Sequence, residues 1–227
     1  MFKELTVPMV HSVDGAQSTS VTAINTSTNP YKAPAFWEGL WRSAGLQSLG
    51  LFVLAYFSYG YAIHFAAVAA GMAVLNLMWF GAALRSSLAD KNQDGWGAAV
   101  TASSTTLGGL FLLLTAAAVG VGDSAAFSGV KDFLWVSFVL TSFPRAMFIM
   151  SGAFGFWRSG IISDKVFAVN VAAIVLVLAG GTTWLSSGFW APDGAYSRLI
   201  SPAISGLWLV FASRTLFSQK PAVKAAW

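Results

Sequence analysis

The feature that most constrains this chain is a long segment without charge. Between Ala44 and Leu84 the sequence contains no Asp, Glu, Lys or Arg. An α-helix rises about 1.5 Å per residue, so a single helix of this length would be about 60 Å long. The hydrocarbon core of a bilayer is only about 30 Å thick. The segment therefore predicts two membrane-spanning helices, over 44–58 and 63–84, joined by a turn near Gly60.

Composition favours a membrane protein over a soluble domain. Hydrophobic residues make up 56% of the chain and charged residues 10%, whereas soluble domains carry about 25% charged residues. Four more apolar stretches follow the first two, over 98–119, 133–156, 166–186 and 199–217. The prediction is an all-α, polytopic membrane protein, with six transmembrane helices between residues 34 and 218. Residues 1–33 are expected to form a flexible polar tail, and 219–227 a short basic one.

The basic residues predict the orientation of these helices. With the N-terminus in the cytoplasm, ten basic residues fall on the cytoplasmic side and two on the outer side. The inner set is Lys3, Lys32, Arg42, Arg85, Lys91, Arg158, Lys165, Arg214, Lys220 and Lys224, and the outer set is Lys131 and Arg198. This asymmetry follows the positive-inside rule. We therefore expect both termini in the cytoplasm and a multi-pass protein of a bacterial inner membrane.

Two short segments at the membrane surface have alternative interpretations. AFWEGLWR, over 35–42, is typical of an interfacial helix, and equally of an aromatic belt that leads into the first span. ADKNQDGWG, over 89–97, contains the first half of an EF-hand pattern. The bidentate glutamate of such a loop belongs at its twelfth position, which is Thr101 when counted from Asp90. A polar turn is therefore expected there, without calcium.

Arg145 is the most informative residue of the predicted interior. It follows Pro144 near the middle of the fourth span, where a charge costs about 2.5–3.5 kcal/mol. All nine acidic residues lie in predicted loops or tails. Arg145 must therefore meet carbonyls, hydroxyls, water or an anion. Pro144 frees the carbonyl of Leu140 and bends the helix. Two interpretations stay open: Arg145 faces a path for an anionic solute, or it is a structural arginine that caps carbonyls or reaches an interface.

Several polar residues of the predicted spans are further candidates for a solute path. The third span contains a run of hydroxyl residues, which either line a pore, bond back to carbonyls or pack helices together. Intramembrane asparagines more often join helices than bind solutes. The complete set of substrate or pore candidates is Arg145, Pro144, Thr141, Ser142, Ser103, Ser104, Thr105, Asn76 and Asn170.

Two stretches carry a resemblance to a known family. KNQDGWGAAVTASSTTLGGLFLLLTA and GFWRSGIISDKVFAVNVAAIVLVLAGG resemble the second cytoplasmic turn with its hydroxyl-rich third helix, and the fourth-to-fifth helix passage, of the acetate/succinate uptake transporter family. The resemblance covers about residues 71–216. It implies a hexamer whose subunits each carry a path for small monocarboxylates. The family's Asn-Pro-Ala-Pro-Leu-Gly-Leu signature is split here into NPYKAPAFWEGL, and a hydroxyl residue near Ser104 replaces an aromatic. No substrate-binding residue is therefore transferred.

These observations lead to two functional hypotheses. The first is a membrane channel or simple transporter for a small anionic solute, such as a monocarboxylate. The second is a non-catalytic membrane subunit of a larger complex, which binds partner helices, lipids or pigments. The partners expected are the lipid bilayer, a small solute, and further copies or foreign subunits, but no nucleic acid, because the basic residues are scattered. No metal, cofactor or enzymatic role is expected, since the sequence offers no catalytic pairing.

Overall fold

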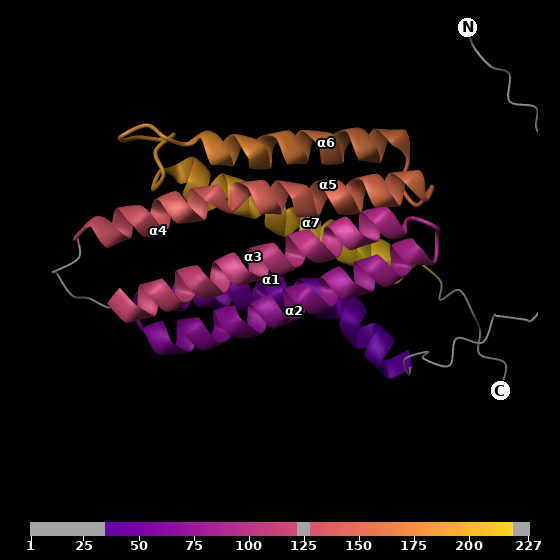
Figure 1. Cartoon of the computed structure of the whole chain (residues 1–227), viewed down its shortest axis with the longest axis horizontal. Coiled ribbons are helices and arrows are strands. Elements are labelled where there is room, and N and C mark those ends of the chain that lie inside the picture. Colours follow the sequence, from indigo (N-terminus) through magenta and orange to yellow (C-terminus); the bar gives the residue numbers. More distant parts are fainter. Residues whose placement is uncertain (1–34, 122–127, 220–227) are drawn as a thin grey trace, which may run out of the picture. The chain divides into compact units, whose positions relative to one another are not determined.

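The computed structural model describes residues 35–121 and 128–219, and the side chains of 42–120 and 132–219. The predicted tails, 1–33 and 219–227, lie outside the described residues except for Gln219. The described chain is helical and contains no strand. Its elements are α1 (Ala35–Ser58), α2 (Ile63–Ala89), α3 (Asp94–Val121), α4 (Ser128–Leu140), α5 (Ser142–Arg158), α6 (Asp164–Ala179), the short helices η2 (Gly180–Thr182) and η3 (Tyr196–Ile200), and α7 (Ser201–Ser218) (Figure 1).

Five of these helical segments are long and apolar enough to cross a membrane. They are Ile63–Ala89, Asp94–Gly120, Asp132–Arg158, Asp164–Thr182 and Tyr196–Ser218. The third combines α4 with α5, and the fifth combines η3 with α7. These helices are typical of a multi-pass integral membrane protein. The first predicted span, 44–58, lies within α1, and a sixth crossing there stays a prediction, as does the side on which each terminus lies.

Two helix boundaries differ from the sequence-based expectation. The segment 35–42 is the start of α1, which runs on into the predicted first span, and the two interpretations of this segment both stay open. The predicted span 166–186 is longer than the helix it describes. α6 ends at Ala179, and η2 follows at Gly180 and Gly181. Glycine is a poor helix former, so regular structure stops at this pair although the sequence stays apolar.

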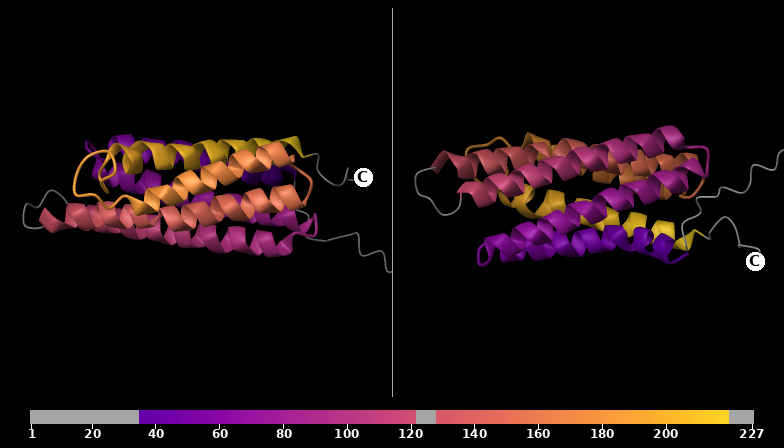
Figure 2. Two further views of the ribbon diagram at one scale, coloured as in Figure 1. Left: turned by 90° about the horizontal axis from the view of Figure 1, so that it is seen from above. Right: turned by 60° about the horizontal axis from the view of Figure 1, so that its bottom comes forward.

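The helices pack in a closed order. α1 packs on α2, α2 on α3, α3 on α5, α5 on α6, α6 on α7, and α7 returns to α1. Figure 2 shows α7 lying between α1 and α6. α5 also touches α2 and α7, so this helix lies at the centre of the bundle. The interior is filled there by buried side chains, which include Phe80, Phe148 and Ile149. The bundle therefore has a packed core and no wide central pore among the described residues.

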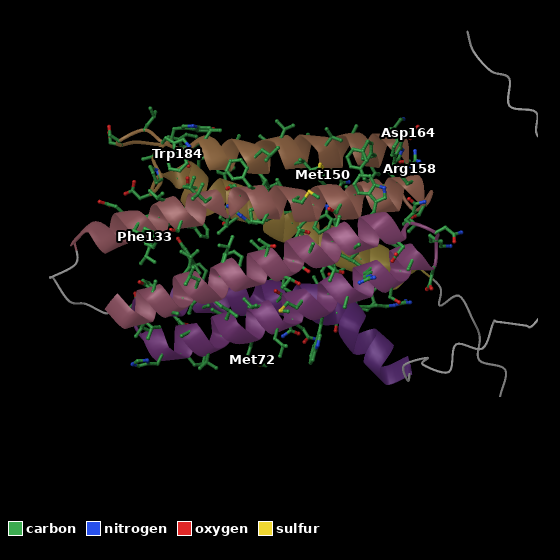
Figure 3. The ribbon with its side chains drawn as sticks, in the orientation of Figure 1. Met72, Phe133, Met150, Arg158, Asp164 and Trp184 are labelled. Carbon is green, nitrogen blue, oxygen red and sulfur yellow. The ribbon has the colours of Figure 1, made fainter. Side chains whose placement is uncertain are left out.

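The two ends of the bundle differ in charge. The guanidinium of Arg42, in α1, donates to the carbonyls of Leu216 and Gln219 at 3.4 and 3.0 Å, so the start of α1 lies beside the end of α7. The α2–α3 and α5–α6 turns lie at this same end (Figure 1), which carries Arg158 and Asp164 in Figure 3, while Phe133 and Trp184 lie at the other. Most basic residues that the structure describes belong to these turns and helix ends. The side of the membrane on which this end lies stays a prediction.

Candidate functional site

A helix break positions the central residue of the candidate site. Pro144 has no N–H and so cannot bond the carbonyl of Leu140. The helix is interrupted there, because α4 ends at Leu140 and α5 begins at Ser142. Thr141 occupies the break, where its hydroxyl donates to the carbonyl of Phe138 at 2.6 Å. Pro144 falls in the first turn of α5, where a missing N–H leaves no bond unmade. Backbone hydrogen bonds continue across the junction, from the N–H of Thr141 to the carbonyl of Phe138 at 3.1 Å and from the N–H of Arg145 to the carbonyl of Thr141 at 3.0 Å, and the bend at Pro144 stays a prediction.

Arg145 lies one turn into α5 and is buried. Its side chain is only 5% exposed. One guanidinium nitrogen, Nη2, donates to the hydroxyl of Ser142 at 2.8 Å. The charge also lies over the ring of Phe138, with Cζ 5.3 Å from the ring centroid. Nε and Nη1 have no hydrogen-bond partner among the described residues. A guanidinium carries five N–H donors, so most of the hydrogen-bonding capacity of this buried cation is unused.

The environment of Ser142 depends on a glycine of η2, directly after the end of α6. A Cβ built on Gly180 would lie 2.9 Å from the Ser142 hydroxyl and 2.6 Å from the Ser201 hydroxyl. Any larger residue would push α6 away from α5 and α7. Ser201 begins α7, is fully buried, and its hydroxyl has no partner among the described residues. The absence of a side chain at Gly180 thus lets the hydroxyls of Ser142 and Ser201 both lie close to its backbone, and the Ser201 hydroxyl is unpaired among the described residues.

A cavity of about 560 Å³ lies against Arg145; we call it the Arg145 cavity. Its walls come from the second half of α1, from α2, α3, α4 and α5, and from η3 with the first half of α7. Most of the lining is aromatic or aliphatic, with Phe52, Phe111 and Phe148 among its rings. The volume falls in the usual range for small-molecule sites, about 300–1,000 Å³. An apolar chamber with one buried cation in its wall is suited to an organic anion.

A second cation lines the same cavity. Arg198, in the π-helical turn η3, is exposed, and its Cζ lies 4.6 Å from the ring centroid of Trp135 in α4. Single π-helical turns are frequent at functional sites. Arg198 thus presents a positive charge at the edge of the cavity, whereas Arg145 presents one in the interior. An anion that approaches would meet the exposed charge first.

The fold and the site can be compared with known proteins. No family model, no curated protein and no solved structure matches this chain. The resemblance to the acetate/succinate uptake transporter family stays a prediction that rests on sequence motifs. Roles for individual residues therefore rest on geometry alone.

The hydroxyl residues of α3 lie apart from the Arg145 cavity. Ser103 and Ser104 are buried, but they donate to carbonyls of their own helix, at 2.8 Å to Ala99 and 2.9 Å to Thr101. Thr105 is exposed on the surface of the bundle. None of the three lines the cavity. In this structure the run provides small packing residues and satisfied hydroxyls.

The two candidate asparagines also have local partners. The amide of Asn76 donates to the carbonyl of Met72 in the same helix at 2.8 Å. Asn170 donates to the carbonyl of Val166, and its oxygen accepts the indole N–H of Trp208 at 2.9 Å. The second bond joins α6 to α7 and fixes the orientation of Trp208, whose ring lines the Arg145 cavity. Asn170 therefore acts on the cavity through Trp208. No sequence pattern singled out Trp208 or Ser201, since their roles depend on how the helices pack.

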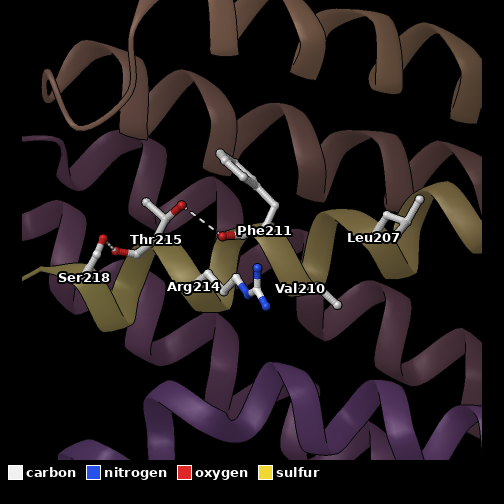
Figure 4. A pocket seen from close by; sticks show the side chains of 6 residues that line it. All are labelled: Leu207, Val210, Phe211, Arg214, Thr215 and Ser218. Atoms are coloured by element: carbon white, nitrogen blue, oxygen red, sulfur yellow. Dashed lines mark hydrogen bonds between the residues drawn. The ribbon is translucent and has the colours of Figure 1, made fainter.

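A second concave region, on α7, lacks the features of a binding site. It is lined by one helix only, from Leu207 to Ser218 (Figure 4). Thr215 donates to the carbonyl of Phe211 at 2.9 Å, and Ser218 to that of Thr215 at 2.8 Å. Both hydroxyls are therefore satisfied within the helix. Arg214 is exposed there, and none of the residues that line this region is buried.

The turn over 89–97 has the geometry of a helix connection. Asn92 adopts a positive φ of 58°, which asparagine tolerates better than most residues. Asp94 begins α3 and lies 3.7 Å from the guanidinium of Arg85. Asp94 thus faces a cation, and no group of three or more potential metal ligands occurs among the described residues.

Proposed function

We propose that this protein is a membrane carrier for a small organic anion, and that Arg145 binds the charge of that anion. The observation that carries the proposal is the buried guanidinium of Arg145, a residue that lines the cavity: two of its nitrogens, Nε and Nη1, are closed off by the protein and have no partner among the described residues. Buried charges are normally paired, because an unpaired one is strongly unfavourable. No described acidic residue pairs with Arg145. A bound anion would supply the missing partner.

The packed core favours a carrier over an open channel. α5 contacts α2, α3, α6 and α7, and outside the Arg145 cavity buried side chains fill the space between them. A hydrated anion needs a continuous line of polar groups to cross, and the hydroxyls of α3 are turned back onto their own carbonyls. Transport by this bundle would require the helices to expose Arg145 to one side and then to the other. The junction of α4 and α5 is a suitable hinge, because Pro144 has no N–H to bond the carbonyl of Leu140.

Uptake into proteoliposomes tests the proposal. The probe is labelled butanesulfonate, which stays ionised at neutral pH and crosses bare bilayers poorly. Uptake should fall at least tenfold with Arg145→Gln, which keeps polarity but removes charge. Arg85→Gln is the matched control, because Arg85 is an arginine of α2 that is half exposed and outside the cavity. Equal uptake by both variants and the unmodified protein would refute a role for Arg145.

One surface feature favours the second hypothesis, a subunit of a membrane assembly. Large apolar side chains on α2 are exposed at spacings of three and four residues, namely Phe65, Val68, Met72, Leu75 and Trp79. Apolar residues at this spacing form the contact stripe of helices that pair along their length. The mass of the particle purified in mild detergent discriminates between the hypotheses. Copurified foreign subunits would favour the assembly role, whereas a monomer or homo-oligomer would favour the carrier.

A further inference from the structure

The lining of the Arg145 cavity points to a more specific class of anion. Few polar groups face it: the two arginines, the phenol of Tyr56 and the hydroxyl of Ser205. The Ser205 hydroxyl already donates to the carbonyl of Ser201 at 3.1 Å. The rest of the wall is hydrocarbon. A small hydrated anion would lose its water there and regain only one charged contact, whereas an anion with a hydrocarbon chain would also bury that chain.

The cavity is bounded on one side by side chains at the surface of the bundle. Phe57, at the end of α1, and Leu207, in α7, both line it, and each is 70% exposed. Val53 lines it as well and is 47% exposed. α1 and α7 pack together from Arg42, which bonds the carbonyls of α7, to Leu49, which lies against Gly206. The cavity therefore opens between α1 and α7 beyond this contact, on an apolar surface of the bundle.

Arg145 lies at the inner end of this route. It comes from the central helix α5, and aromatic rings separate it from the surface: Phe52 packs on Phe111 with centroids 4.8 Å apart, and Phe111 lies 6.5 Å from Phe138. Phe138 in turn lies beneath the guanidinium. A molecule that enters from the lipid side thus passes an aromatic wall before its charged group can reach Arg145.

We propose that the Arg145 cavity binds an acyl carboxylate, whose carboxylate pairs with Arg145 and whose hydrocarbon chain lies against the aromatic wall, after lateral access from the bilayer between α1 and α7. This rests on the proposed function, because it assumes that Arg145 binds an anion. It adds a chain-length preference that a site for acetate or chloride would lack.

Binding of a chain-length series tests this proposal. Acetate, butyrate, hexanoate and octanoate are titrated into the protein in zwitterionic nanodiscs and followed by calorimetry, with octanol as the uncharged analogue. Nanodiscs that carry Arg145→Gln measure partition into lipid and are subtracted. Affinity should rise about fourfold per methylene, the change that corresponds to about 0.8 kcal/mol per buried CH₂, until the cavity is full. Octanol should show no Arg145-dependent binding.

Cavity-filling variants provide the second arm. Ala203 lines the cavity from α7, so Ala203→Phe should weaken octanoate binding at least tenfold and leave acetate almost unchanged. Ala203→Leu is a milder version should the larger ring disturb folding. Ala172→Phe, at an exposed position of α6 outside the cavity, is the control and should change neither affinity.

The outcomes separate the two proposals. Arg145-dependent binding of acetate and octanoate with equal affinity would overturn the acyl-chain inference and leave the anion carrier intact. The same chain-length slope in Ala203→Phe as in the unmodified protein would also overturn it, because the chain would then lie elsewhere. Absence of any Arg145-dependent binding would overturn both.

Discussion

The pairing of Arg145 with Ser142 allows a direct test of whether the arginine is structural or functional. A structural arginine would be strongly stabilised by its surroundings. A binding arginine would contribute little net stability to the fold until a ligand binds it. Replacement of Arg145 by methionine, which keeps most of the length of the side chain and removes the charge, distinguishes these cases through the free energy of unfolding.

The contacts of Arg145 set the expected magnitude. A charge at mid-depth costs about 2.5–3.5 kcal/mol. Against this, the bond to the Ser142 hydroxyl at 2.8 Å contributes about 1.5–3 kcal/mol, as hydrogen bonds to charged groups do. The contact with Phe138, at 5.3 Å, adds about 0.5–1 kcal/mol. These terms nearly cancel, so we expect Arg145→Met to change the free energy of unfolding by no more than about 1 kcal/mol in either direction.

Ser142→Ala should behave differently in the two backgrounds. With Arg145 present, it removes the hydrogen bond that the buried charge makes and should destabilise the protein by about 1.5–3 kcal/mol. With methionine at 145, the same substitution should have a small effect. Ser151→Ala is the control: Ser151 is a buried serine of the same helix whose hydroxyl donates to Met147, and its effect should be equal in both backgrounds.

Reversible unfolding in mixed micelles, followed by circular dichroism, measures all of these variants. Additive effects of Ser142→Ala and Arg145→Met would refute the coupling inferred from the structure. A loss of 3 kcal/mol or more with Arg145→Met alone, about what removal of one partner from a buried ion pair costs, would show a structural arginine and count against the carrier. Saturating octanoate at 100 times its Kd should stabilise the unmodified protein by about 2.7 kcal/mol and leave Arg145→Met unchanged.

Two further predictions concern packing and orientation. Gly152→Ala should destabilise the protein by about 1–3 kcal/mol, because the new Cβ would lie 2.7 Å from the indole of Trp208. Gly109→Ala is the control: its new Cβ would have no atom within 4 Å, so it should stabilise α3 slightly. Thermal unfolding compares the two variants. The chain contains no cysteine, so Lys91→Cys and Asp193→Cys can be labelled singly in membrane vesicles. Impermeant reagents should reach the first only from the cytoplasm and the second only from outside, and labelling of both from one side would refute the orientation.

The sequence predicted the helices well because their length and apolarity follow from the bilayer. The sequence also predicted an irregularity before Arg145, since proline cannot donate the bond to the carbonyl of Leu140, and α4 gives way to α5 at Thr141. The end of α6 was not predicted, because hydropathy alone does not show where regular structure stops within an apolar run. The glycines Gly180 and Gly181 mark that end in the sequence. The need for glycine there depends on the close approach of α5 and α7, which the sequence does not show.

The polar candidates also differ in how far their roles could be predicted from the sequence. Arg145 could be singled out because a charge without an acidic partner at that depth needs an explanation wherever it points. Ser103 and Ser104 could not be assigned, because a serine in a helix can bond its own carbonyls and leave no trace in the sequence. Whether a hydroxyl faces a cavity depends on the rotation of each helix, which is set by contacts between distant residues.

The remaining question is why a buried cation persists in a core that could have been made apolar. The described acidic residues lie at helix ends and in turns, for example Asp94 and Asp164, where they begin helices. Ser142 satisfies a single nitrogen of Arg145, and Gly180 keeps the surrounding space open. Methionine or leucine at 145 would fill the same volume without desolvating a charge, and such replacements are often neutral or stabilising. Stability alone therefore gives no reason for arginine at this position, whereas recognition of an anion does.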